Sequence, residues 1–136
     1  EVRPRTTGTA LMKVILETGE LPDLTTVDQA ARFAIEQGAD FVKTSTGKTP
    51  VSATIDAATT ILRVIADADR PVGIKPSGGI STADDAAGYI AAAEEIMGEG
   101  WVTPATFRFG ASGLLNALID AAGLDPAPAA RSADGY

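Results

Sequence analysis

Four cationic side chains recur along the chain, each inside a short apolar run that ends in glycine. They are Lys13, Lys43, Lys75 and Arg108, separated by 30, 32 and 33 residues. A lone lysine in a strand is usually solvated, but two lysines on neighbouring strands disfavour each other's charge, and partial burial acts in the same direction. A neutral amine attacks a carbonyl to give an imine, which withdraws electrons while a C–C bond breaks or forms. The repeat therefore predicts an imine-forming lysine, either Lys43 or Lys75.

Three glycine-containing loops follow the apolar runs and indicate a second kind of chemistry. The loops are Thr46–Lys48, Ser77–Gly79 and Gly110–Ser112. Bare backbone N–H groups at the carboxyl ends of strands suit a phosphate group, and Lys48 adds a positive charge. A single loop of this kind is more often an ordinary tight turn. Three loops that converge at one edge of a sheet, together with Lys48, predict a phosphate-binding site.

The spacing of the cations also indicates which elements hold them. A repeat of about 30 residues suits a strand, a helix and a return to the next parallel strand. Thr82 with Asp85 resembles a capping box at the start of one helix, and Gly38 follows the end of another. Apolar periodicity predicts four helices, over residues 26–37, 54–67, 82–97 and 113–122. The order of elements predicts an α/β fold with a parallel sheet.

The parallel order favours a (β/α)8 TIM barrel, in which inner-face positions near the carboxyl ends of the strands open into the active site. Because side chains alternate along a strand, Lys43 and Lys75 should share this face, opposite to the apolar Val42. A complete barrel needs about 250 residues, so the 136 residues here would supply about the last four units. Residues 1–123 then form half of a barrel domain, and residues 124–136, which lack periodicity, form a flexible tail. Two sheet edges would stay unpaired unless another half covers them.

Composition argues against several partners and chemistries. A net charge of -7 disfavours nucleic acid and anionic membranes, which bind clustered Lys and Arg. Cysteine and histidine are absent, which removes disulfides, thiolate nucleophiles and nearly every zinc site. The chain starts at Glu1 with neither an initiator methionine nor a signal peptide, which suggests an internal starting point. We expect a soluble, cytoplasmic protein that needs no metal or other cofactor.

Four motifs in order resemble the deoxyribose-phosphate aldolase family, and together they cover nearly the whole chain. They lie at residues 13–19, 38–48, 73–80 and 108–112. The resemblance implies a class I aldolase, a lyase of deoxyribonucleotide catabolism that works through a lysine Schiff base. Its reaction would split 2-deoxy-D-ribose 5-phosphate reversibly into D-glyceraldehyde 3-phosphate and acetaldehyde.

The resemblance also implies roles for individual residues. Lys43 matches the Schiff-base lysine, and Lys75 matches the second lysine that favours its neutral form. Gly113 stands where some members have a second serine, so one hydroxyl contact to the phosphate would be missing. The matching phosphate-binding positions are Gly47, Lys48, Gly78, Gly79, Gly110 and Ser112.

Several further positions belong to a second tier. One branch of the family ends in a tyrosine that takes part in proton transfer, and Tyr136 matches it. Lys13 and Glu17 are inner-face candidates for orienting charge and water, although Lys13 could equally be a structural ion-pair partner. The catalytic aspartate of the family lies on an earlier strand, outside these residues. Asp40 does not replace it, because Asp40 precedes its strand and fits the turn there.

Two other functions remain open at this point. The chain could belong to another Schiff-base aldolase that shares Lys43 and the phosphate loops but accepts a different phosphosugar. It could also be a non-catalytic half-barrel that works only when assembled with a missing N-terminal half or through self-association. Metal-dependent aldolases are disfavoured because the chain offers no histidine ligands.

Overall fold

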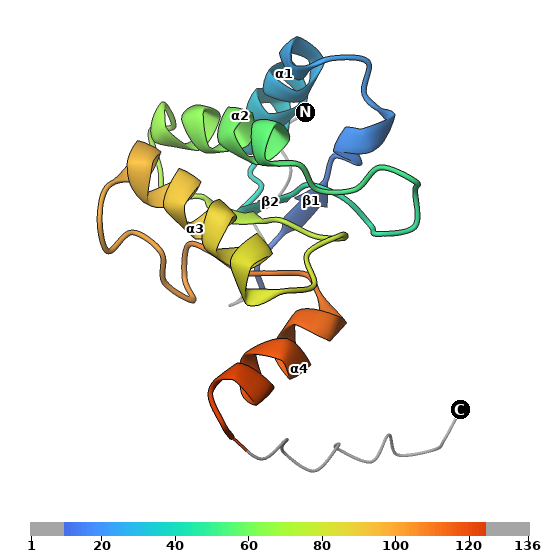
Figure 1. The fold of residues 1–136 in the computed structure, drawn as a ribbon. Helices are drawn as coiled ribbons and strands as arrows, with labels where there is room; N and C mark the ends of the chain where they lie inside the picture. Colours follow the sequence, from blue (N-terminus) through green and yellow to red (C-terminus); the bar gives the residue numbers. More distant parts are fainter. Residues whose placement is uncertain (1–9, 125–136) are drawn as a thin grey trace.

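The computed structural model describes residues 10–124, which form an α/β unit around a parallel sheet (Figure 1). The sheet has the order β1-β2-β3, and both neighbouring pairs are parallel, as predicted. Each strand has three residues. The strands are β1 (Lys13–Ile15), β2 (Phe41–Lys43) and β3 (Gly73–Lys75).

Helices connect the strands and lie side by side, with α2 between α1 and α3 (Figure 1). Three of the four begin where a side chain satisfies free N–H groups: Asp23 accepts from Thr26, Thr54 accepts from Ala57, and Thr82 with Asp85 forms the predicted capping box. All four predicted helices are present within two residues of their expected ends, whereas the 3-10 helix η1 (Thr18–Glu20) was not foreseen. The helices are α1 (Leu24–Glu36), α2 (Ile55–Ala66), α3 (Ala83–Met97) and α4 (Ser112–Ala121).

The apolar run around Arg108, over residues 106–113, was expected to form the fourth strand of the repeat, but it is not a regular strand. Its backbone meets β3 at two isolated parallel bridges, Ile74 with Phe107 and Ser77 with Gly110. Pro76 lies between them and has no N–H to donate, which interrupts the ladder after β3. The segment still runs beside β3 in the expected order, so it occupies the place of a fourth strand.

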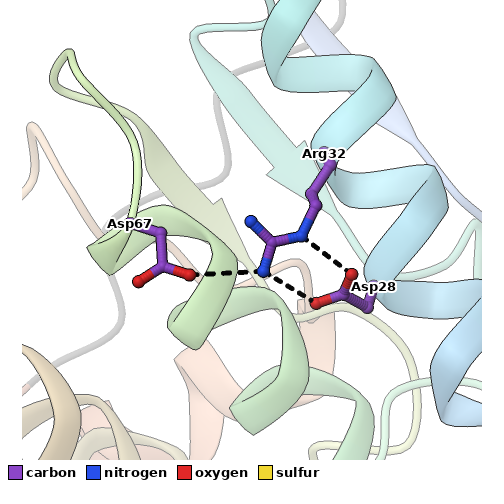
Figure 2. A network of polar contacts seen from close by, with 3 residues as sticks. All are labelled: Asp28, Arg32 and Asp67. Atoms are coloured by element: carbon purple, nitrogen blue, oxygen red, sulfur yellow. Dashed lines mark hydrogen bonds and ion pairs between the residues drawn. The ribbon is translucent and has the colours of Figure 1, made fainter.

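The core lies between the sheet and the helices. Val42 and Ile74 are fully buried there against apolar side chains of α1, α2 and α3. Arg32 joins the outer surfaces of two helices, because its guanidinium bonds to Asp28 on α1 and to Asp67 at the end of α2 (Figure 2). The helices thus cover the face of the sheet that carries Val42 and Ile74, and the lysines lie on the opposite face. Among residues 10–124, no helix combines the length and apolarity that a membrane span requires.

Candidate active site

The two central lysines lie side by side at the carboxyl ends of neighbouring strands. Lys43 of β2 is the register partner of Lys75 in β3, so their backbones are about 4.8 Å apart. Both side chains are partly exposed, while Val42 and Ile74, one position earlier, point into the core. The predicted shared face is therefore confirmed. The chemical roles of the two lysines remain predictions.

An aromatic ring that sequence reasoning missed lies on the lysine face, two residues before the lysine pair along the strands. Phe41 precedes Lys43 by two residues, faces the same side of the sheet and is only 1% exposed. Its ring covers Gly73, where an added Cβ would stand 2.3 Å from a ring carbon. The Lys13 Nζ and the Arg108 Cζ lie 5.3 and 4.5 Å from the ring centroid. The available signal was Gly73 itself, because glycine at a strand position often marks a close approach.

These cations influence one another electrostatically. Burial is the largest cause that lowers the pKa of Lys13, followed by the charges of Lys75, Arg108 and Lys43. The described contact of the Lys13 amine is the Phe41 ring, and no ion pair within residues 10–124 involves it. The structure therefore gives no support to Lys13 as a structural ion-pair partner.

The glycine loops converge on one hollow of about 350 Å³ beyond the ends of the strands. Five of the six residues predicted to bind phosphate line it: Gly47, Lys48, Gly78, Gly79 and Gly110. Other lining residues extend the same loops: Thr46, Ser77, Ile80, Ser81, Ala111 and Gly113. The sixth predicted residue, Ser112, is the first residue of α4, next to lining residues on both sides.

The loops reach one another because their glycines lack side chains. Gly47 and Gly78 have φ angles of 80° and 86°, and a Cβ on Gly78 would lie 3.1 Å from the Gly47 Cα. A Cβ on Gly110 would lie 2.4 Å from the Ser77 Oγ, which donates to the Gly110 carbonyl. At the start of α4, no side chain caps the first turn. Free N–H groups at a helix start attract anions.

The remaining candidates lie elsewhere. Glu17 bonds to the β2–α2 loop through Thr46 and Thr49, and its pKa is lowered, chiefly by the bond from the Thr46 hydroxyl. Asp40 accepts from the Met12 N–H, so it belongs to the turn before β2, as predicted. Tyr136 lies outside the described residues.

The fold and site together define a parallel α/β protein with paired lysines at the strand ends and a glycine-lined hollow beyond them. Residues 5–118 match the model of the DeoC/LacD family aldolases. The chain belongs to this family.

Individual relatives agree with the family match. A deoxyribose-phosphate aldolase from Agrobacterium fabrum is 51% identical over 136 residues, 99% of this chain and 51% of the relative. The chain thus spans about half the length of that curated relative. An apo structure assigned as the same enzyme in Toxoplasma gondii ME49 is 29% identical with a TM-score of 0.78 over 88% of this chain and 48% of the other. A tetrameric deoxyribose phosphate aldolase from Aeropyrum pernix gives 25% identity and a TM-score of 0.61 over 83% and 42%.

Proposed function

We propose that this chain carries the substrate-binding lysines of a deoxyribose-phosphate aldolase. The observation that carries the proposal is the register pair of Lys43 and Lys75, placed on one face of the sheet within strands whose loops line an anion-sized hollow. The likeness to relatives of that name supports the choice of substrate.

The proposed reaction begins with the neutral amine of Lys43. It attacks C1 of open-chain 2-deoxyribose 5-phosphate, water leaves, and an iminium forms. The iminium accepts the electron pair of the C2–C3 bond as that bond breaks, the C3 hydroxyl loses its proton, and glyceraldehyde 3-phosphate departs. Protonation of the remaining enamine and hydrolysis release acetaldehyde and the free amine. Lys75, its register partner, is proposed as the second lysine of the site, and Tyr136 is our candidate for proton transfer.

The phosphate of the substrate would occupy the glycine-lined hollow. The backbone N–H of Gly79 and those at the start of α4 are the proposed donors. Gly78 and Gly110 shape the hollow, because their own N–H groups donate to the carbonyls of Gly110 and Pro76. The Lys48 ammonium, on an exposed part of the rim, adds a positive charge. Gly47 allows its loop to approach the Gly78 loop. Ser112, the first residue of α4, would contribute its backbone N–H to the phosphate.

A second half of the barrel would complete this site. We propose that residues 1–123 belong to the last four units of a (β/α)8 barrel. The tail expected over residues 124–136 lies, apart from Leu124, outside the described residues. The missing strands would come from an N-terminal half or from a second copy, and the assembly would work in the cytoplasm. Ile15, the register partner of Lys43, supports this arrangement because it is 43% exposed on the lysine face. An apolar side chain in that position suits a covered surface.

Imine trapping tests the proposal. The chain, alone and with the missing strands supplied in trans, is incubated with acetaldehyde and borohydride and digested for mass spectrometry. We expect an N-ethyl group on Lys43, its loss in Lys43→Arg, and its retention in the control Lys48→Arg. In Lys75→Leu, adduct formation on Lys43 should fall, because the second lysine of the pair has gone. An adduct on other lysines alone, or none in either preparation, would refute the proposed chemistry.

A further inference from the structure

A single carboxylate connects the end of β1 to the loop that carries Gly47 and Lys48. Glu17 accepts the Thr46 backbone N–H at 3.1 and 3.2 Å, one bond to each oxygen. It also accepts the Thr46 hydroxyl and the Thr49 hydroxyl, the latter at 3.3 Å. Thr46 thus gives Glu17 two donors, its N–H shared between both oxygens and its hydroxyl, from 29 positions away. The Thr49 hydroxyl is divided between Glu17 and the nearer Val51 carbonyl at 2.8 Å.

The Thr46 hydroxyl also bonds to the backbone of the Gly47–Lys48 loop. While it donates to Glu17, it accepts the backbone N–H of Lys48 at 3.2 Å. Glu17, Thr46 and Lys48 therefore form a chain of hydrogen bonds that fixes the backbone conformation around Gly47. Both Gly47 and Lys48 line the hollow.

The backbone of Glu17 is specialised for this contact. Its φ of 55° and ψ of 59° are left-handed, and it is the one non-glycine residue with positive φ among residues 10–124. That conformation is strained for a residue with a Cβ, and such strain persists where surrounding contacts enforce it. Two residues on, the absent side chain of Gly19 gives the far end of the loop room, since a Cβ there would lie 2.0 Å from the Val51 oxygen. The loop is thus held at both ends by the segment after β1.

We infer that Glu17 is a positioning residue that confers selectivity for phosphorylated substrates by holding the Gly47–Lys48 loop through Thr46. The inference rests on the proposed function and deepens it. The hydrogen bonds of Glu17 go to the loop, and the charge of Lys43 is the last of the influences on its carboxylate. A carboxylate presents acceptors only, whereas the amide of Gln presents one acceptor and one donor. In Glu17→Gln, the N–H group of the amide would face the N–H and hydroxyl donors of Thr46. We expect the loop to bind phosphate more weakly.

The test compares 2-deoxyribose 5-phosphate with unphosphorylated 2-deoxyribose in the full, assembled enzyme. In Glu17→Gln, kcat/KM for the phosphosugar should fall about tenfold more than kcat/KM for deoxyribose, mainly through KM. Thr46→Val should repeat this loss and Thr46→Ser should restore selectivity. Glu20 is an exposed carboxylate in the 3-10 helix that Glu17 precedes. Glu20→Gln is therefore the matched control, and it should change kcat/KM for neither sugar. Equal losses for both sugars, or unchanged selectivity in both Glu17→Gln and Thr46→Val, would overturn the inference.

A binding measurement separates this inference from the proposed function. Inorganic phosphate is titrated into the wild type and Glu17→Gln, and the amide resonances of Gly47 and Lys48 are followed by NMR. We expect a dissociation constant about tenfold higher in the variant. Equal phosphate affinities overturn the role of Glu17 whatever the enzyme does. Missing imine formation in the wild type, with the affinity difference intact, refutes the aldolase chemistry and leaves the positioning role standing.

Discussion

Gly73→Ala is the sharpest test of how the lysine face is built. An added Cβ would stand 2.3, 2.6 and 2.7 Å from three ring carbons of Phe41, distances that real Cβ atoms do not reach. Phe41 is 1% exposed, so its ring cannot swing into solvent without losing buried contacts. Overpacking of this kind costs about 1–3 kcal/mol, and we expect a loss of about 2 kcal/mol in the free energy of unfolding. The measurement is urea unfolding followed by circular dichroism.

Two further variants decide whether the ring is the cause. Phe41→Leu removes the ring carbons Cε1 and Cζ, so Gly73→Ala should cost at least about 1 kcal/mol less in that background. Gly88→Ala makes the same substitution in α3, where the nearest atom to the new Cβ is the Ile55 Cδ1 at an ordinary 3.6 Å. It should stabilise the helix by up to about 1 kcal/mol. Additive costs of Gly73→Ala and Phe41→Leu would show that the contact with the ring does not govern the site.

Two other perturbations test a helix start and the charge of the lysine face. Thr82→Ala should lower stability by about 1 kcal/mol, because it breaks the capping box with Asp85, whereas Thr82→Ser should not. Lys13→Met tests the lowered pKa of Lys13: the penalty for its charge is fully present below that pKa and disappears as pH rises toward 10.5. The unfolding free energy of Lys13→Met minus that of the wild type should therefore decrease from pH 7 to pH 10.5. A constant difference, or the same trend in the exposed control Lys48→Met, would contradict the electrostatic cause.

Local and periodic features of this chain could be predicted from its sequence. The helices follow apolar repeats of 3.6 residues, and the Thr82 capping box depends on residues three apart. The pairing of Lys43 with Lys75 also followed, since equal repeats place equivalent residues at equivalent strand positions. These predictions needed no knowledge of distant side-chain contacts.

Contacts that depend on the final register could not be predicted in the same way. The Phe41 ring meets Gly73 only because β2 and β3 pair at that offset, and the sequence places them 32 residues apart. Glu17 looked like an inner-face residue by alternation, but its left-handed backbone turns it onto Thr46 in the next loop. The run around Arg108 was predicted as a regular strand, but its pairing is interrupted by Pro76, which lies in the neighbouring segment after β3.

The distribution of charge bears on the proposed phosphate site. Within residues 10–124, the ion pairs belong to Arg32 and Arg70, which lie away from the hollow. Lys13 and Arg108 instead contact the Phe41 ring, so their charges are not neutralised by carboxylates. The chain as a whole carries a charge of -7, which repels polyanions at long range. On the proposed function, we therefore expect the positive face of this acidic chain to bind a compact phosphate ester in preference to a polyanion.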